Sequence, residues 1–337
     1  MASPRALSAS ARTGAIVAAS ESELIERYFR GLGAARADVV LGIGDDAALL
    51  RVPADAELVL TTDVLVEGVH FLPGAPAHSL GHRALAVNLS DIAAMGATPA
   101  WALLALNLPQ ADEDWLQLFA AGFGTLARRY EVALVGGNLS RGPLSIAVQL
   151  AGIVPRGAAL RRDGAHRGET LYVSGNPGDA AAGLKRLRGE LPGSAEAGAY
   201  LQRRFEFPEP RVALGLGLRG LASACIDVSD GLYADMQRLL LASGCGASID
   251  IERLPVSWAL REVLGEAAWR QALAGAEDYE LCFSASQTRA HDIAALAART
   301  GTVVTRIGTL EAGAGIELKS NNTVMQFSPL GFDHFRD

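Results

Sequence analysis

The chain has 337 residues, of which 50% are hydrophobic and 20% are charged, and this excludes a disordered protein, which would combine low hydrophobicity with high charge. Its formal net charge of −7 argues against a broad basic surface for nucleic acid. No apolar run approaches the roughly 18 residues of a membrane span, and three cysteines without CxxC spacing argue against a disulfide framework or a thiolate zinc site.

Residues 1–19 are rich in Ala and Ser, include two Arg and contain no acid. This composition resembles that of a transit peptide. The whole chain, however, uses Arg and hardly any Lys, so a flexible tail is the better interpretation. The cysteine pattern predicts a reducing compartment, and we therefore expect a cytoplasmic protein.

The first half of the chain mixes strands and helices without a regular βαβ alternation. Hydrophobic spacing predicts helices over 21–31, 82–95 and 112–130, and strands over 39–43, 58–60, 102–108, 132–135 and 145–153. This order predicts an α+β fold with an antiparallel or mixed sheet, and it argues against a Rossmann fold.

A polar stretch rich in Arg and Gly, over 155–168, marks a domain boundary. We therefore expect a tail (1–19), an N-terminal domain (20–157) and a C-terminal domain (158–337). In the second half the pattern predicts strands over 170–174, 224–228, 247–251 and 279–284, and helices over 180–187, 196–205, 212–220 and 232–242. The last 30 residues are expected to form strands and loop.

Acidic residues recur where predicted strands meet loops, beside Gly, Ser or Thr. They are Asp45, Asp46, Asp63, Asp227, Asp230, Glu277 and Asp278. Taken singly, each is more simply a helix cap or a turn residue. Asp91 differs, because it lies within an apolar helix and its charge needs a partner there.

Taken together, the acids point to a cation site. Two like charges about 4 Å apart repel by roughly 4 kcal/mol at an effective dielectric near 20. Several such pairs would exceed a domain's stability margin of about 5–15 kcal/mol. Oxygen ligands suit Mg²⁺, which proteins commonly share with phosphates. The sequence therefore indicates nucleotide or phosphate chemistry, although the Walker A motif and the kinase Gly-rich loop with its lysine are absent.

Three further segments are candidates for ligand contact. Residues 136–138 are predicted as a glycine turn suited to close backbone approach to a phosphate. Residues 175–179 are either an anion-binding helix start or, somewhat more simply, a strand-to-helix turn. His70 follows an apolar segment shortly after Asp63 and is equally compatible with a structural role and a substrate contact.

The ordered motifs of the chain resemble those of the thiamine-monophosphate kinase family, in the AIR-synthetase-like (PurM-like) superfamily. The matching segments are GIGDDAALL (42–50), TTDVLVEGVHF (61–71), ALAVNLSDIAAMGATPAW (84–101), VGGNLSRGPLSI (135–146), GDAAAGL (178–184), IDVSDGL (226–232), GAEDYELCF (275–283) and GFDHF (331–335). Each is weak alone, but the ordered set is specific and covers nearly everything from about residue 20 onward.

The resemblance implies an activity and an architecture. Members of the family transfer the γ-phosphoryl group of ATP to thiamine monophosphate, the last step of thiamine diphosphate biosynthesis, and use several Mg²⁺ ions. The implied PurM-like fold has an N-terminal α/β half, whose sheet pairs with that of a second subunit, and a C-terminal α+β half. We therefore expect a homodimer that binds ATP, Mg²⁺ and thiamine monophosphate.

The resemblance also assigns residues. Metal ligands are expected at Asp46, Thr61, Thr62, Asp63, Asp91, Asn138, Asp227 and Asp230. The nucleotide is expected near Gly137, Asn138, Arg162 and Ser229, and thiamine monophosphate near His70, Glu277 and Phe332. Asn138 departs from the Asp of many members. The acids are expected to support direct in-line transfer, with no covalent nucleophile.

Three alternatives stay open at this point. Aminoimidazole-ribotide and selenophosphate synthetases belong to the same superfamily, but the latter would carry a reactive Cys near the N-terminal Gly-rich segment, whereas all three cysteines lie beyond residue 220. A hydrogenase-maturation relative would end in a Cys-containing tail. A non-catalytic sensor would bind Mg-ATP without forming a product.

Overall fold

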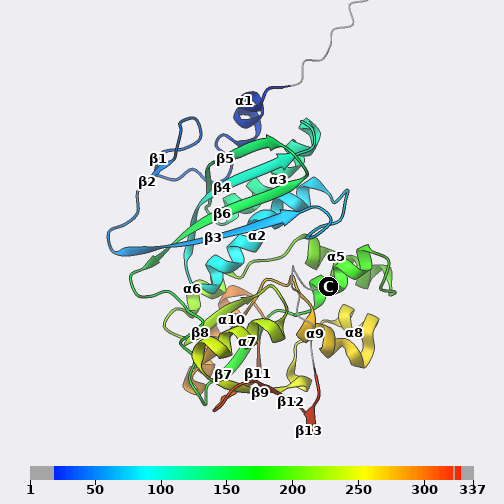
Figure 1. Cartoon of the computed structure of the whole chain (residues 1–337). Helices are drawn as coiled ribbons and strands as arrows, with labels where there is room; N and C mark the ends of the chain where they lie inside the picture. Colours follow the sequence, from blue (N-terminus) through cyan, green and yellow to red (C-terminus); the bar gives the residue numbers. More distant parts are fainter. Residues whose placement is uncertain (1–18, 322, 328–337) are drawn as a thin grey trace, which may run out of the picture.

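Two large β-sheets organise the chain, one in each half of the sequence, and the N-terminal half also has a separate two-stranded sheet (Figure 1). The computed structural model describes residues 19–321 and 323–327. Nearly all of the predicted tail, and Phe332, therefore lie outside the described residues. The two sheets and their helices confirm the predicted mixed α+β architecture.

The N-terminal half is a four-stranded sheet with two long helices on one face (Figure 1). Its elements are α1 (Glu21–Leu24), a π-helical turn (Ile25–Phe29), β1 (Val39–Leu41), β2 (Leu49–Leu50), β3 (Ala56–Val66), α2 (Ala77–Ala94), β4 (Thr98–Leu108), α3 (Glu113–Arg129), β5 (Ala133–Arg141) and β6 (Ser145–Pro155). The sheet order is β3-β6-β4-β5, and only β4 and β5 run parallel.

Helices α2 and α3 lie unusually close together because each has a glycine at the contact. A methyl group at Gly81 would lie 2.1 Å from the backbone oxygen of Phe119, and one at Gly122 would lie 2.0 Å from that of His78. This close approach buries α2 almost completely. The polar side chains on its buried faces therefore have to find their partners inside the protein.

The two faces of the four-stranded sheet differ. Leu65 is 3% exposed whereas Leu60 is 70% exposed, although both lie on β3. Because side chains alternate along a strand, Thr61 and Asp63 share the helix-covered face with Leu65, and Thr62 lies on the open face with Leu60. The strand therefore divides the predicted ligands between two faces.

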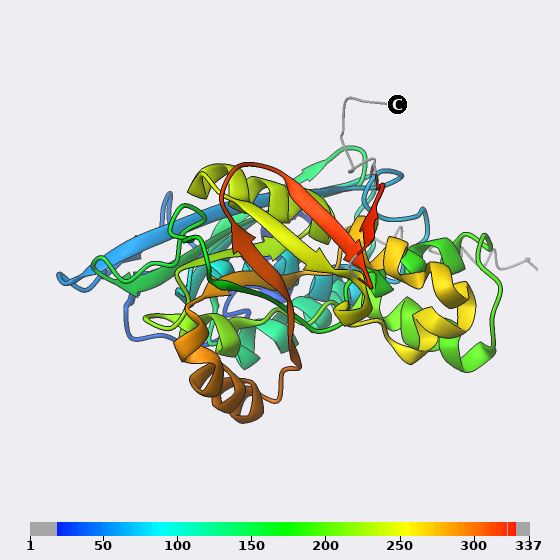
Figure 2. The same ribbon diagram turned by 90° about the horizontal axis from the view of Figure 1, so that it is seen from below.

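The C-terminal half contains a seven-stranded sheet of order β13-β12-β9-β11-β7-β10-β8. Its strands are β7 (Thr170–Ser174), β8 (Ala224–Val228), β9 (Gly246–Asp250), β10 (Glu280–Ala285), β11 (Val304–Glu311), β12 (Ile316–Ser320) and β13 (Thr323–Met325). Its helices are α4 (Asp179–Leu187), α5 (Ala195–Glu206), α6 (Val212–Leu218), α7 (Leu232–Ser243), α8 (Trp258–Leu264), α9 (Ala268–Ala274) and α10 (Ala290–Thr300). Figure 2 shows the green and yellow helices α4, α5, α8 and α9 gathered at one side.

One hydrophobic core joins the two halves. It contains Leu85 and Ile92 of α2 together with Leu214 of α6 and Phe283 of β10, all fully buried. Helix α2 packs on its own sheet and also on α6 and β8. The residues of α2 are therefore the ones that meet both halves.

Two sequence expectations were wrong in the folded chain. Residues 136–138 form no turn but lie within β5, where the pairing with β4 is irregular; Gly137 has φ of +150°, and a Cβ there would lie 1.9 Å from the Leu104 oxygen. Helices α8, α9 and α10 were not predicted.

Among the described residues, no helix is long and apolar enough to cross a bilayer.

Candidate active site

Acidic side chains from both halves meet beside the C-terminal end of α2. Asp91 accepts a hydrogen bond from the Thr61 hydroxyl of β3 at 2.5 Å. Its neighbour Ser90 donates to Asp227, near the end of β8, at 3.2 Å. The expected partner of Asp91 is thus present, and β3, α2 and β8 converge at this point.

The acids of this cluster disfavour one another's charges. Burial, and then the charges of Asp91, Glu277 and Asp230, raise the pKa of Asp63 to about 7. Burial also raises the pKa of Asp227, and Asp91 adds to this effect. Burial raises the pKa of Asp91 as well, opposed by its hydrogen bond from Thr61 and by the Arg162 charge. Such a cluster is stabilised by added positive charge.

Arg162 acts on this cluster through its charge, whereas His70 is held by the backbone at the end of β3. Arg162 is exposed in the link between β6 and β7, and its charge opposes the raised pKa values of both Asp91 and Asp227. His70 lies in the turn after β3, where its Nδ1 accepts a hydrogen bond from the Val66 amide at 3.0 Å. That bond leaves Nε2 as the protonated nitrogen of a neutral ring.

The loop after β8 places Asp230 at the cluster. The amides of Ser229 and Asp230 both donate to the Asp235 carboxylate at 3.0 Å, and the Asp230 carboxylate pairs with Arg238 at 2.6 Å. Helix α7 begins after Gly231 without a side-chain cap. The simple explanation of Asp230 as a helix cap is therefore wrong.

Glu277 reaches the cluster through an unusual backbone. Its amide donates to the Ser229 oxygen at 2.7 Å, and its φ of +73° is rare for a residue other than glycine. The next residue, Asp278, accepts hydrogen bonds from the amides of Gly178 and Ala180 at 2.6 and 3.1 Å. The Asp278 carboxylate thus occupies the helix start at residues 175–179, which the sequence indicated as a candidate anion site.

A second group of predicted residues lies on the open face of the four-stranded sheet. A cavity of about 820 Å³ is lined there by Asp46, Gly137 and Asn138 together with apolar side chains of the strands. Thr62 is also on this face and donates its hydroxyl to the Val148 oxygen at 3.2 Å. Within a single chain, the residues on this open face therefore lie apart from the cluster that contains Asp63.

The side chains alone do not form a closed metal cage. Over residues 19–321 and 323–327, no group of three or more His, Cys, Asp and Glu side chains is arranged to hold a metal ion. The cluster combines carboxylates with hydroxyl oxygens, which are the donors that Mg²⁺ prefers. Its chemistry thus fits a hard cation that keeps waters and shares phosphate oxygens.

Sequence reasoning missed Arg83 and Tyr279, which both contact Glu277. Arg83 donates to the Glu277 carboxylate at 2.5 Å and Tyr279 donates at 2.6 Å. The signal for Arg83 was available, because a charged residue in an apolar helix requires a partner. Tyr279 carried no such signal, since an aromatic residue near a strand is ordinary.

Comparisons with known proteins identify the family of the chain. The AIR synthase related protein N-terminal domain matches residues 44–154, and the corresponding C-terminal domain matches residues 166–321. A thiamine-monophosphate kinase from Salmonella typhimurium is 45% identical over 322 residues, which cover 95% of this chain and 99% of that protein. One from Haemophilus influenzae is 37% identical and covers 95% of this chain and 99% of that protein.

Solved structures show the same likeness. The crystal structure of thiamine-monophosphate kinase from Stenotrophomonas maltophilia has a TM-score of 0.80 and 47% identity, covering 84% of this chain and 92% of that one. A structure of AaThiL complexed with AMPPCP and TMP has a TM-score of 0.75 and 36% identity, covering 87% and 92%. The hydrogenase maturation protein HypE, at 20% identity and a TM-score of 0.75, shares the fold. The chain belongs to the thiamine-monophosphate kinase family of AIR synthase related proteins.

Proposed function

We propose that the protein transfers the γ-phosphoryl group of ATP to thiamine monophosphate, forming thiamine diphosphate and ADP. Relatives that are 45% identical to this chain over 95% of its length are thiamine-monophosphate kinases, and one related structure contains AMPPCP and TMP. The observation on this chain that carries the proposal is the convergence of Asp63, Asp91 and Asp227 between the two halves.

The reaction requires neutralisation of the substrates' charges and alignment of the substrates more than it requires a strong base. The acceptor is a phosphate oxygen, which is already ionised near neutral pH. The difficulty is to bring two polyanions together in line. Fixed groups that position them and stabilise their charge supply most of the rate in such reactions. The absence of a catalytic Lys or His motif in the sequence is compatible with this chemistry.

The acids fit Mg²⁺ as the group that performs the neutralisation. We assign Asp63, Asp91, Asp227 and Asp230, with Thr61 beside them, as ligands of Mg²⁺ at the cluster, and Asp46, Thr62 and Asn138 as ligands of further Mg²⁺ on the open face. When bound, Mg²⁺ supplies charge stabilisation to the transferring phosphoryl group. Because Mg²⁺ is usually held by one or two carboxylates plus waters and phosphates, the site needs no closed cage of protein ligands before ATP binds.

The remaining residues are assigned to the two substrates. Arg162, whose charge acts on Asp91 and Asp227, neutralises phosphate charge on ATP, with Ser229 and Gly137 as further nucleotide contacts. His70 and Glu277 bind thiamine monophosphate from the side of β3 and of the 275–279 segment. Phe332, the third residue assigned to this substrate, lies outside the described residues.

We also propose that two copies pair through the open face of the four-stranded sheet. Several apolar side chains are exposed on this face: Leu58, Leu60, Val64 and Leu103. A sheet face that exposes several large apolar side chains is typical of an interface. Pairing covers the cavity lined by Asp46, Gly137 and Asn138. The three cysteines are free and buried, which suits a protein of the reducing cytoplasm.

A direct assay tests the proposed function. The protein is incubated with ATP, MgCl₂ and thiamine monophosphate, and thiamine diphosphate is measured by chromatography. Asp63→Asn and Asp91→Asn should lower kcat at least about 100-fold, whereas Asp292→Asn, an exposed acid of α10, should leave it unchanged. Near-normal kcat of either site variant at saturating Mg²⁺ would refute its role. Binding of Mg-ATP without product would identify a sensor instead.

A further inference from the structure

Arg83 of α2 is the largest side chain that is fully buried among the described residues, with 2% of it exposed. One terminal nitrogen donates to the Phe205 oxygen at 3.1 Å and the other donates to Glu277 at 2.5 Å. Its guanidinium carbon lies 3.9 Å from the centre of the Phe205 ring. The Nε atom has no partner among these residues. Stability alone does not explain this arginine, because a buried cation with an unsatisfied donor is costly.

Both donors to Glu277 use the same oxygen. Arg83 and the Tyr279 hydroxyl donate to Oε2, at 2.5 and 2.6 Å. No donor from the described residues makes a hydrogen bond to Oε1. The side chain of Glu277 is 23% exposed, and its charge acts on Asp63. One carboxylate oxygen is therefore fixed inside the protein, while the other is available at the acidic cluster.

The backbone around Glu277 is fixed as firmly as the side chain. Glu277 and Tyr279 have φ of +73° and +53°, a region that side chains other than glycine rarely occupy. The Tyr279 amide is held by the Val228 oxygen at 2.8 Å, and Asp278 is held by two amides at the start of α4. Such conformations persist where the surroundings enforce them, and they concentrate at functional sites.

We propose that Arg83 and Tyr279 are positioning residues, which orient Glu277 so that its Oε1 accepts a hydrogen bond from the amino group on the pyrimidine ring of thiamine monophosphate. This inference rests on the proposed function. The amino group is the only N–H donor of this substrate near neutral pH. A charged acceptor held in one orientation binds such a donor strongly, because little side-chain entropy is lost on binding.

The proposal predicts discrimination between two acceptors. Oxythiamine monophosphate carries an oxygen in place of the pyrimidine amine. The fixed Oε1 of Glu277 would face the oxygen of oxythiamine monophosphate with no hydrogen between the two acceptors. The parent protein should therefore prefer thiamine monophosphate. A Glu277 side chain free to rotate could turn away, and the preference would shrink. The ratio of kcat/KM for the two acceptors therefore reports the orientation of Glu277.

Tyr279→Phe is the decisive variant, because it removes only the hydroxyl. With the full-length protein we expect KM for thiamine monophosphate to rise about tenfold and the acceptor preference to fall about tenfold, with KM for ATP within about twofold of the parent. The matched control is Tyr172→Phe, at a buried tyrosine of β7 stacked on Phe283 at 5.2 Å, which should change none of these values. Arg83→Lys, which keeps a cation, should retain more of the preference than Arg83→Met.

Specific results overturn the proposal. An unchanged acceptor ratio in Tyr279→Phe refutes it, and so does an equal rise in KM for ATP and for thiamine monophosphate, which indicates general damage. If Arg83→Met does not fold, the tyrosine variant still decides. A parent protein that forms thiamine diphosphate but shows no acceptor preference refutes this inference alone. A parent that forms none refutes the proposed function as well.

Discussion

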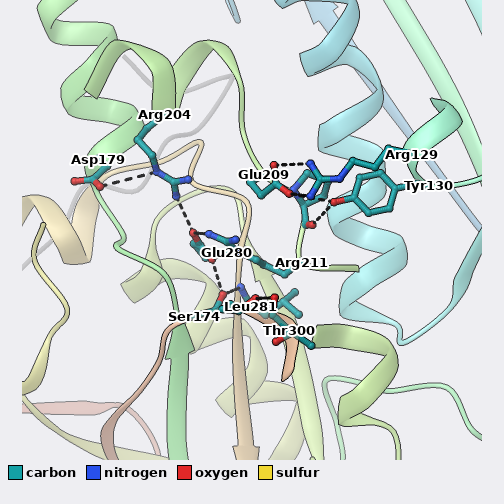
Figure 3. A network of polar contacts seen from close by, with 12 residues as sticks. Arg129, Tyr130, Ser174, Asp179, Arg204, Glu209, Arg211, Glu280, Leu281 and Thr300 are labelled. Atoms are coloured by element: carbon teal, nitrogen blue, oxygen red, sulfur yellow. Dashed lines mark hydrogen bonds and ion pairs between the residues drawn. The ribbon is translucent and has the colours of Figure 1, made fainter. Parts of the chain in front are cut away.

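The substitution Glu280→Gln should destabilise the protein by about 3 kcal/mol at pH 7 and by about half as much at pH 3. Glu280 begins β10 and is fully buried. It accepts hydrogen bonds from Arg204 at 2.7 Å, from Arg211 at 2.6 Å and from the Ser174 hydroxyl at 2.6 Å. Figure 3 shows these side chains converging on the one carboxylate.

The magnitude follows from the pKa of Glu280. Burial raises this pKa, but Arg211 and Arg204 overcome the effect and lower it from 4.5 to about 2. At 1.36 kcal/mol for each pH unit, the ionised form contributes about 3 kcal/mol to folding at pH 7. Because the folded pKa is the lower one, this contribution is present above pH 4.5 and is lost as the pH falls toward 2. The typical cost of breaking a buried ion pair, about 3–5 kcal/mol, describes the same loss seen from the two half-buried arginines and agrees with this value.

Urea unfolding followed by circular dichroism measures the effect. The parent and Glu280→Gln are compared at pH 7, 5 and 3, with Glu113→Gln as the control, because Glu113 pairs with Arg27 on the surface. The control should differ from the parent by less than about 1 kcal/mol. A difference below about 1 kcal/mol for Glu280→Gln at pH 7, or one that stays constant down to pH 3, would show that the buried ion pairs do not stabilise the fold.

Three further predictions concern single positions. Asp63→Asn should abolish turnover and yet melt, without Mg²⁺, at or above the parent temperature, because burial and neighbouring acids already disfavour its charge; a melting point several degrees lower would contradict this. Gly137→Ala should destabilise the protein by more than about 2 kcal/mol in urea, since its Cβ would lie 1.9 Å from the Leu104 oxygen. Gly136→Ala, whose Cβ meets only a flexible side-chain end at 2.9 Å, should cost less, and equal losses would refute the argument. Leu60→Asp should yield monomers in light scattering with unchanged circular dichroism, and a persistent dimer would exclude the open face as the interface.

Strands that are short, apolar and bounded by turn residues could be predicted well. Strands β7 and β8 span the predicted residues 170–174 and 224–228. Strand β3 was predicted only over 58–60 but extends from Ala56 to Val66. Asp63 is unfavourable in a strand, but the strand continues through Thr61, Thr62 and Asp63 because pairing with β6 satisfies their backbone. Local composition could not reveal that pairing.

The site was predictable in part. The rule that a charge in an apolar helix needs a partner led to Asp91, and the same rule applied to Arg83 would have led to Glu277. The division of the candidate ligands between two faces, with Thr61 and Asp63 on one and Asn138 on the other, could not be predicted. Which face a strand residue takes depends on its register with its neighbours, and register is a property of the whole sheet.

The most direct test is to locate the metal itself. Crystals grown with Mn²⁺ and a non-hydrolysable ATP analogue would be measured at a wavelength where manganese scatters anomalously. Peaks should lie within ligand distance of Asp63, Asp91 and Asp227, about 2.0–2.4 Å from their oxygens. Clear density for the nucleotide with manganese bound elsewhere would show that these carboxylates serve another purpose.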